Sequence, residues 1–361
     1  MALPVFYGGY QHNYKRIARL FAIKIVFGRF ILIKKNVNSH LKKIDTMTKK
    51  LIIIALGGNA LLKNGQKGSI EEQNLNVRET LRNLFPLIQA GHKLIITHGN
   101  GPQVGYILLK NDAGEQVYDI PQVPLDVAVA DTQSEIGYLI QSELFSLLRQ
   151  NNMEREIIST NTMVEVAADD PAFKNPTKRI GKTYYDAAEV STLKQTKGWV
   201  FKEEVKNGKT GWRRVVPSPK PVDIISKNTI KTLADSGAIV IAVGGGGVPV
   251  TIEGDTLHGS EAVIDKDLAS ALLAKQIGAD QFIILTDVPN VYIDYGTPQQ
   301  KPLEVLDATT ARQYLKEGKF GEGNMAPKIQ AALNFIESGG QEVLITDLNG
   351  IKTQQGTRIV G

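Results

Sequence analysis

Two lysines and an aspartate in the last third of the chain have the types and positions that phosphoryl transfer requires. Lys266 and Asp267 lie in VIDKDLAS at the start of an expected helix, and Lys328 lies in NMAPK just inside the start of the next. Ammonium groups at helix starts can neutralise the oxygens of a phosphoryl group in transfer, and Asp267 could aim one or both of them. Taken alone, a Lys-Asp pair at a helix start is also an ordinary capping arrangement.

Four glycine clusters lie where an anion could be held. Residues 57–59 (Gly-Gly-Asn), 99–101 (Gly-Asn-Gly) and 244–247 (four glycines) each follow an expected strand, and residues 321–324 precede the NMAPK helix. Glycine lets the backbone approach an anion and offers N–H donors, and the helix start that follows adds partial positive charge. A single Gly-Asn turn is usually only a turn, but clusters at successive strand ends indicate a phosphate-binding edge.

Three matches to nucleotide-binding motifs fail on inspection. Residues 99–105 resemble a dinucleotide fingerprint, but they contain an extra residue, follow the second expected strand and lack the acidic residue downstream. IGKT at 180–183 and NGKT at 207–210 resemble the end of a phosphate-binding loop. Pro176 and Glu203 stand where that motif needs its first glycine, so neither segment qualifies.

The elements that must position these residues alternate between short apolar runs and helical patterns, which is typical of parallel βαβ units. The expected strands, each nearly continuous in apolar residues, are 51–56, 93–98, 155–160, 238–244, 281–287 and 342–347. The expected helices are 70–91, 127–151, 265–279 and 325–340. Continuous apolar strands need helices on both faces, so the pattern predicts a three-layer αβα sandwich with a mainly parallel open sheet.

This alternation of strands and helices is interrupted at about residues 167–221, a stretch rich in Pro, Gly, Lys and aromatics. Residues 200–216 read as a hairpin around Asn207-Gly208. Because long insertions in a compact domain are more often lids or binding loops than plain connectors, we expect a small protruding subdomain. Lys178, in NPTKRIG, could close from it over the site, or could be a solvated charge.

Composition excludes several classes of site and partner. The chain has no cysteine, and its five histidines show no metal-ligand spacing, so no protein-held metal site is expected. The formal net charge is +5, but residues 1–46 hold nine Lys and Arg against one Asp. The rest of the chain is therefore mildly acidic, which does not fit nucleic-acid binding.

The basic extension, residues 1–46, admits two interpretations. Residues 17–35 are apolar but contain Arg19, Lys24 and Arg29, so they are not expected to span a membrane. Wound as a helix they are amphipathic and partly match an organelle transit segment, although serine is scarce. Alternatively Met47 is the true start, since MTKKLIIIALGG runs directly into a strand, and the extension is inert. The second interpretation predicts a cytoplasmic protein.

From about residue 50 to the end, the sequence resembles the carbamate kinases of the amino-acid kinase family. The segments that carry the resemblance are ALGGNALL (55–62), THGNGPQVG (97–105), DPAFKNPTKRIGKTY (170–184), GGGGVPV (244–250), VIDKDLAS (263–270), LTDVPNVY (285–292) and NMAPK (324–328). The glycine loops and the late lysine are shared with the wider family, whereas the NPTK insertion and VIDKDLAS are specific to carbamate kinases. Arg179 departs from the pattern, because proline is expected after the NPTK lysine.

The resemblance implies roles for individual residues. Lys266 and Lys328 would neutralise the phosphates, Asp267 would orient them, and Lys178 would reach in from the lid. The residues implied for the carbamate and phosphoryl site are Gly58, Asn59, Gly99, Asn100, Gly101, Gly245, Gly246 and Gly247. Those implied for the nucleotide are Thr286, Asp287, Tyr292 and Met325.

The resemblance also implies reversible phosphoryl transfer between ATP and carbamate, giving ADP and carbamoyl phosphate. It implies Mg²⁺ bound with the nucleotide, a homodimer, and use in making ATP during fermentative arginine breakdown. The implied domains are an N-terminal lobe at 47–255 for carbamate or carbamoyl phosphate and a C-terminal lobe at 256–361 for ATP or ADP. Carbamate is already an anionic nucleophile, so no general base is needed, and none stands out in the sequence.

Two alternatives stay open. The first is another amino-acid kinase, whose acceptor would need a larger pocket with further cationic or hydroxyl groups and would not predict the NPTK lid. The second is a binding module for carbamoyl phosphate or nucleotide without catalysis. Such a module could have lost any of the three charged residues named first, yet all three are present.

Overall fold

The structure, a computed structural model, describes residues 49–63, 65–206, 208–321 and 325–361. The extension at 1–46 lies outside the described residues, as do Asn207 of the expected hairpin turn and residues 322–324 of the fourth glycine cluster. All elements below belong to one unit of the chain, Lys49–Gly361.

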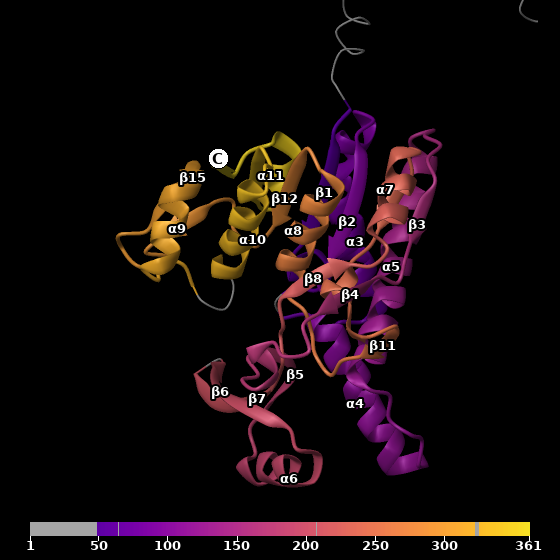
Figure 1. Cartoon of the computed structure of the whole chain (residues 1–361), viewed down its shortest axis with the longest axis vertical. Helices are drawn as coiled ribbons and strands as arrows, with labels where there is room; N and C mark the ends of the chain where they lie inside the picture. Colours follow the sequence, from indigo (N-terminus) through magenta and orange to yellow (C-terminus); the bar gives the residue numbers. More distant parts are fainter. Residues whose placement is uncertain (1–48, 64, 207, 322–324) are drawn as a thin grey trace, which may run out of the picture. The chain divides into compact units, whose positions relative to one another are not determined.

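An eight-stranded sheet forms the centre of this unit, with the strand order β15-β17-β16-β12-β1-β2-β9-β3 (Figure 1). Its strands are β1 (Leu51–Leu56), β2 (Lys93–His98), β3 (Ile157–Ser159), β9 (Ile239–Ile241), β12 (Gln281–Leu285), β15 (Val305–Asp307), β16 (Glu342–Thr346) and β17 (Thr357–Val360). The strands from β16 to β3 pair in parallel, and β17 is antiparallel to β16. The predicted mainly parallel open sheet is confirmed.

Helices cover both faces of the sheet, as the continuous apolar strands predicted. Along β1, Ile52, Ile54 and Leu56 face one cluster of buried side chains, and Ile53 and Ala55 face the other. The helices are α3 (Ile70–Gln89), α4 (Gly101–Tyr118), α5 (Leu125–Gln150), α6 (Ala187–Lys197), α7 (Lys227–Asp235), α8 (Lys266–Ile277), α9 (Ala308–Lys316), α10 (Met325–Glu337) and α11 (Leu348–Thr353). The first cluster contains residues of α3, α5 and α11, and the second contains residues of α7, α8, α9 and α10, so the three-layer sandwich is confirmed.

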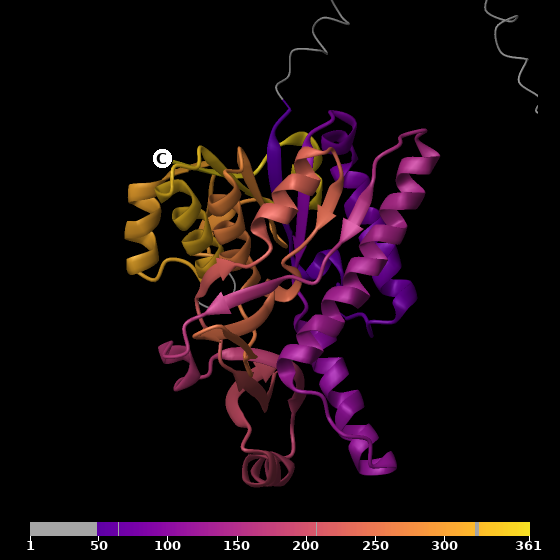
Figure 2. The same ribbon diagram turned by 45° about the vertical axis from the view of Figure 1, so that its right-hand side comes forward.

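Two smaller sheets lie beyond the carboxyl ends of the central strands. One has the order β11-β10-β4-β8 and consists of β4 (Met163–Val166), β8 (Pro221–Ile224), β10 (Val248–Glu253) and β11 (Thr256–Gly259). The other has the order β5-β7-β6 and consists of β5 (Lys178–Tyr184), β6 (Val200–Lys206) and β7 (Lys209–Val216). This second sheet carries α6 and protrudes with α4 from the main body (Figures 1 and 2). A two-stranded ribbon of β13 (Val291–Ile293) and β14 (Lys301–Leu303) completes the strands.

Among the differences between the structure and the sequence-based expectations, two concern the edge of the central sheet and a helix beside the protruding sheet. The strand expected at 155–160 is a short edge strand whose residues are half-buried or exposed, because no further strand pairs beyond β3 among the described residues. The second difference is α4, which was not predicted as a helix and whose start contains Gly101 and Gly105. No helix in the described part of the chain is long and apolar enough to cross a membrane.

The contact between α4 and the protruding sheet depends on two glycines. A Cβ atom on Gly105 would lie 2.3 Å from the Cα atom of Gly181, which is in β5 and has a positive φ of 68°. We expect Gly105→Ala to lower the free energy of unfolding by about 1–3 kcal/mol, because backbone must move to admit the methyl group. The measurement is urea-induced unfolding.

Gly114→Ala, on the same helix, is the matched control. A Cβ atom there would meet only Ile120, at 3.8 Å. This change should raise the stability by about 0.5–1 kcal/mol, because alanine loses less conformational entropy than glycine in a helix. Equal effects of the two changes would contradict the close approach of α4 and β5.

Candidate active site

The predicted site residues lie at one edge of the central sheet. β12, β1, β2 and β9 are neighbours and run parallel, so their carboxyl ends share that edge. Gly58 and Asn59 follow β1, Gly99 to Gly101 follow β2, and Gly245 to Gly247 follow β9. Thr286 and Asp287 follow β12. The expectation that these loops meet at one edge is therefore correct.

Asp267 joins the two predicted catalytic lysines. Its carboxylate accepts one hydrogen bond from the ammonium of Lys266 and another from that of Lys328, with 3.2 Å between Lys328 Nζ and Asp267 Oδ2. All three side chains are nearly buried, with 4% of Asp267, 13% of Lys266 and 9% of Lys328 exposed. One carboxylate thus lies between two ammonium groups and holds both of them in place.

The pKa of Lys266 reflects this environment. Burial lowers the pKa of its ammonium below the usual lysine value, and the charge of Lys328 lowers it further, while Asp267 opposes both effects. Desolvation disfavours a charged lysine, and a nearby carboxylate favours it. Asp267 therefore keeps Lys266 protonated as well as holding it in place.

The start of α8 fixes the direction of this cluster. Asp265 is the N-cap residue, and its Oδ1 atom accepts hydrogen bonds from the backbone N–H of Asp267 at 2.9 Å and of Leu268 at 3.3 Å. Lys266 is the first residue of the helix, so its side chain leaves from the end where the helix dipole is positive. An anion at this point meets both the ammonium groups and the dipole.

The glycine loop after β9 packs directly against the loop after β2. A Cβ atom on Gly245 would lie 2.3 Å from Nδ2 of Asn100, and φ at Gly245 is +66°. Gly246 and Gly247 also have positive φ, and a Cβ atom on Gly247 would lie 2.1 Å from Val164. Glycine is therefore required here both by backbone conformation and by space.

Asn100 and Gly99 connect this loop pair to the charged cluster. The Asn100 side chain is buried and donates a hydrogen bond to Thr132 Oγ1 at 2.9 Å. A Cβ atom on Gly99 would lie 3.3 Å from the Lys266 side chain. The structure thus brings together Gly99, Asn100, Gly245 and the three charged residues.

The predicted lid lysine also reaches this edge. Lys178 Nζ in β5 donates a hydrogen bond to Asp265 Oδ2 at 2.8 Å, and the two side chains are 32% and 18% exposed. Burial would raise the pKa of Asp265, but the charge and hydrogen bond of Lys178 outweigh it and hold that pKa below the usual range. The protruding sheet is thereby tied to the N-cap of the helix that carries Lys266 and Asp267.

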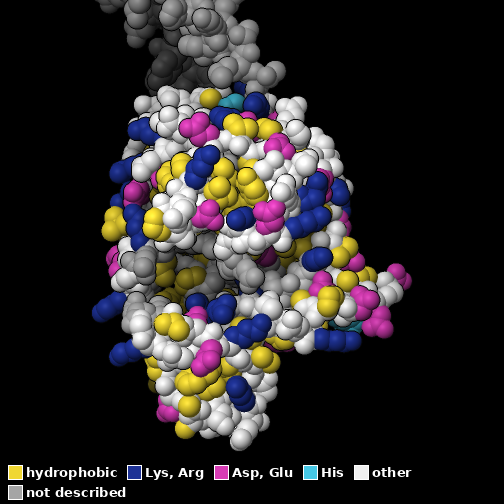
Figure 3. All heavy atoms as spheres, turned by 90° about the vertical axis from the view of Figure 1, so that its left-hand side faces the viewer, with side chains coloured by type: hydrophobic (Ala, Val, Ile, Leu, Met, Phe, Trp, Pro, Cys, Tyr) yellow, Lys and Arg dark blue, Asp and Glu magenta, His cyan; other side chains and the backbone are white. Residues whose placement is uncertain are grey.

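The four predicted nucleotide residues line a single pocket of about 690 Å³: Thr286, Asp287, Tyr292 and Met325. Tyr295, Lys319 and Phe320 complete much of its wall. The rings of Tyr292 and Tyr295 lie 5.7 Å apart between centroids, so the wall offers an aromatic surface as well as a cation. On the face that carries α9 and α10, the surface is hollowed above a row of Lys and Arg side chains (Figure 3).

Some residues of the site were missed from sequence. Asp265 was not singled out, although Asp before a helix is a strong N-cap signal. Thr132 was not considered, and no local pattern marks it, because it contacts Asn100 across the fold. Lys319 and Phe320 were also missed, since they reach the pocket from the loop after α9.

Comparisons with known proteins agree with this geometry. The sequence model of the amino acid kinase family matches residues 50–347. The carbamate kinase of Pyrococcus furiosus is 47% identical over 315 residues, which cover 86% of this chain and 99% of that protein. The carbamate kinase of Halobacterium salinarum is 48% identical over 295 residues, which cover 81% and 92%. The chain belongs to the carbamate kinases of the amino acid kinase family.

Solved structures of carbamate kinases share the fold. The carbamate kinase of Giardia lamblia bound to AMP-PNP superposes with a TM-score of 0.79 at 38% identity, covering 87% of this chain and 99% of that one. The chain is thus an enzyme of the phosphotransferase class, and the resemblance found from its motifs is confirmed.

The described residues of this carbamate kinase contain no group of three or more His, Asp or Glu side chains that could hold a metal ion. The positive charge at the site comes instead from lysines and from backbone N–H groups. A resident metal therefore has no donor set in this part of the chain.

Asp267→Asn tests whether Asp267 keeps Lys266 charged. Loss of the carboxylate should lower the pKa of Lys266 further, so its proton leaves at a lower pH. We expect kcat/KM for phosphoryl transfer to fall, and its decrease on the alkaline side to begin at lower pH than in the wild type. The measurement is the pH dependence of kcat/KM.

Glu79→Gln serves as the control, because Glu79 forms an exposed ion pair with Lys63 away from the site. Circular dichroism should show that both variants are folded before rates are compared, since removing one partner of a buried ion pair can also destabilise the fold. An alkaline limb at the wild-type pH in Asp267→Asn would refute this role of Asp267.

Proposed function

We propose that the chain catalyses reversible phosphoryl transfer between ATP and carbamate, giving ADP and carbamoyl phosphate. The observation that carries the proposal is the buried cluster in which Asp267 accepts hydrogen bonds from the ammonium groups of both Lys266 and Lys328. The cluster lies at the edge reached by the glycine loops. Met325, which lines the nucleotide pocket, and Lys328 are both in the first turn of α10, so the pocket adjoins the cluster. An anionic phosphoryl group is the chemical complement of that cluster.

In the direction of ATP formation, a β-phosphate oxygen of ADP attacks the phosphorus of carbamoyl phosphate. The bond between phosphorus and the carbamoyl oxygen breaks, and carbamate leaves as an anion. No proton has to be transferred at the reacting oxygens, so the protein supplies charge and position instead of a base. Lys266 and Lys328 would contact the oxygens of the phosphoryl group, where negative charge is spread in the transition state.

The glycine loops would hold the carbamoyl group and its phosphate. Gly245 to Gly247 and Gly99 to Gly101 bring backbone to the edge of the sheet, and Gly58 and Asn59 start from the neighbouring strand. The N–H groups of Gly246 and Gly247 are bonded within the loop to the carbonyls of Val243 and Gly244, which fixes its shape. Donors on a loop preorganised in this way stabilise an oxyanion without reorganising during the reaction. Asn100 would fix the loop pair, since its amide is held by Thr132.

Mg²⁺ would enter with the nucleotide, coordinated by phosphate oxygens, because the described residues offer no donor set of their own. When bound it would neutralise part of the phosphate charge. Thr286, Asp287, Tyr292 and Met325 would border the nucleoside, with the tyrosine wall available for stacking. We infer a nucleotide at this position from the pocket and from the carbamate kinase of Giardia lamblia, whose solved structure is bound to AMP-PNP.

The remaining expectations are part of the same proposal. The lobes at 47–255 and 256–361 would bind carbamoyl phosphate and nucleotide, since the glycine loops fall in the first and the nucleotide pocket in the second. A homodimer is supported by the edge strand β3 and by Tyr138 on α5, which is 68% exposed. Location in the cytoplasm and use in arginine breakdown fit this enzyme class, and the extension at 1–46 decides between cytoplasm and organelle.

The reaction is tested by measuring ATP formation from ADP, Mg²⁺ and carbamoyl phosphate in a coupled assay. We expect turnover by the wild type, and a loss on the order of a hundredfold or more in Lys328→Ala, because a transition-state charge contact is removed. Lys275→Ala, on the surface of α8, is the control and should keep the wild-type rate. Binding of carbamoyl phosphate without turnover would instead favour the non-catalytic module.

Lys178→Ala tests the role of the protruding sheet. Removing this ammonium should raise the KM for carbamoyl phosphate at least severalfold, because the tie to Asp265 and a cation next to the substrate are lost together. The effect on kcat should be smaller than that of Lys328→Ala. The measurement is the dependence of the initial rate on carbamoyl phosphate concentration.

Lys182→Ala is the matched control, because Lys182 is in the same strand but forms a half-exposed ion pair with Glu189. It should leave KM within about twofold of the wild type, as expected for an exposed pair. Wild-type saturation by carbamoyl phosphate in Lys178→Ala would refute the lid role.

A further inference from the structure

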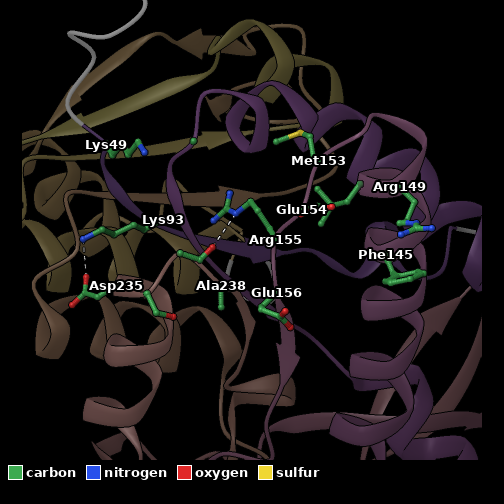
Figure 4. A pocket seen from close by; sticks show the side chains of 14 residues that line it. Lys49, Lys93, Phe145, Arg149, Met153, Glu154, Arg155, Glu156, Asp235 and Ala238 are labelled. Carbon is green, nitrogen blue, oxygen red and sulfur yellow. Dashed lines mark hydrogen bonds and ion pairs between the residues drawn. The ribbon is translucent and has the colours of Figure 1, made fainter. Parts of the chain in front are cut away.

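A second large pocket lies at the opposite edge of the central sheet, where the strands begin. Its volume is about 770 Å³. Lys93 at the start of β2, Ala238 before β9 and Glu156 before β3 all line it (Figure 4). The glycine loops of the active site follow the other ends of β2 and β9. The pocket is therefore separated from the active site by the length of the strands.

Arg155 brings to this pocket a buried donor atom that has no hydrogen-bond partner among the described residues. Its Nε atom donates a hydrogen bond to the backbone carbonyl of Gly237 at 3.0 Å, which fixes the guanidinium plane. Its Nη1 atom is buried and has no hydrogen-bond partner among the described residues. A buried donor without an acceptor is costly, and a guanidinium presents its donors as a fork suited to an oxyanion.

The pKa of Arg155 indicates a desolvated guanidinium with no carboxylate bound to it. Burial lowers the pKa of its guanidinium, and no carboxylate raises it. Arg78 shows the contrast, because Glu143 accepts two hydrogen bonds from it, at 2.8 and 2.9 Å, and raises its pKa. Arg155 thus has the desolvation of a buried arginine without the counter-ion that usually offsets it.

The other charges of the pocket set the charge of a ligand. Lys93 is already neutralised by Asp235 at 2.8 Å, whereas Lys49 and Arg149 have no ion pair within the described ranges. In total four cations face three acids, the other two acids being Glu154 and Glu156. A polyanion would be repelled by these acids, so the pocket suits an anion with one or two charges. Met153 and Leu148 add an apolar wall.

We propose that this pocket is a second binding site, which takes a small carboxylate or phosphate group and holds it mainly through the Arg155 guanidinium. Lys49 and Arg149 stand at the same pocket and add positive charge. The site is independent of the phosphoryl-transfer chemistry, since it shares no lining residue with the nucleotide pocket or with the lysine cluster.

The test measures stabilisation of the full chain by inorganic phosphate and, separately, by malonate. A ligand that binds only the folded state raises the midpoint of thermal unfolding in a concentration-dependent way. We compare the wild type, Arg155→Gln and the control Arg78→Gln. Any binding of these anions at the active site is common to all three proteins, so a difference between them reports the second pocket.

We expect Arg155→Gln to need at least about tenfold more anion than the wild type for the same rise in midpoint, because a charge-assisted hydrogen bond is worth about 1.5–3 kcal/mol. Arg78→Gln should respond as the wild type. The anion that depends more strongly on Arg155 identifies the headgroup as phosphate or carboxylate. An identical response of Arg155→Gln and the wild type to both anions would overturn the proposal.

A second variant guards against loss of folding, since Arg155 also supports the backbone at Gly237. The double change of Lys49→Gln and Arg149→Gln alters side chains that form no hydrogen bond within the described residues, so it should leave the fold intact. It should weaken the anion response severalfold while ATP formation without added anion stays at the wild-type rate. A wild-type anion response in this double variant would likewise count against the site.

Discussion

The structure depends on a single buried carboxylate, that of Asp267, which lies between two ammonium groups. Burying charge is expensive, and a buried ion pair seldom stabilises a protein more than apolar residues would. In the arrangement of Lys266, Asp267 and Lys328, one carboxylate holds two ammonium groups at the edge where the phosphoryl group would bind. Such a cluster makes physical sense when a further anion binds to it during the reaction. The stability lost in the free protein is then recovered as affinity for the phosphoryl group in transfer.

This constraint explains why an open parallel sheet serves as the scaffold. The lysines come from two helices, α8 and α10, whose first turns lie at the same edge as the glycine loops. Ser270 Oγ donates a hydrogen bond to the carbonyl of Lys266 at 2.6 Å and is itself joined to Thr97 of β2 at 2.7 Å. Because that hydroxyl proton is used by Lys266, Thr97 must be the donor to Ser270. The first turn of α8 is thus fixed to the strand whose loop would contact the substrate.

Much of the fold and of the charged cluster could be predicted from the sequence, because the relevant signals are local. The strand at 51–56 was predicted with its observed bounds, since six consecutive apolar residues end at a Gly-Gly turn. The strand at 93–98 and the helix starts near Lys266 and Met325 were likewise predicted from local sequence patterns. A contact of Asp267 with one or both lysines was also predicted, because it needs only two helix starts at one edge.

Features that depend on distant contacts could not be predicted in this way. The helix α4 was missed because Gly101, Gly105 and Gly114 lower its helix propensity, while its contact with Gly181 becomes visible only in three dimensions. The bond between Lys178 and Asp265 joins residues 87 positions apart. The pocket around Arg155 gathers the starts of separate strands and the end of α5, and none of these segments is distinctive alone.

Two adjacent residues of α5 hold both glycine loops of the site, and this explains a strained residue beside them. Thr132 binds Asn100, while Gln133 Oε1 accepts a hydrogen bond at 2.8 Å from the backbone N–H of Thr162. The hydroxyl of Thr162 in turn accepts a hydrogen bond at 3.0 Å from the N–H of Val243, whose φ is +53°. A β-branched residue in that conformation costs about 1–3 kcal/mol and persists only where its surroundings enforce it. The strain lies directly before Gly244, so α5 sets the path of the loop that would contact carbamoyl phosphate, and stability is given up there to fix the loop before substrate arrives.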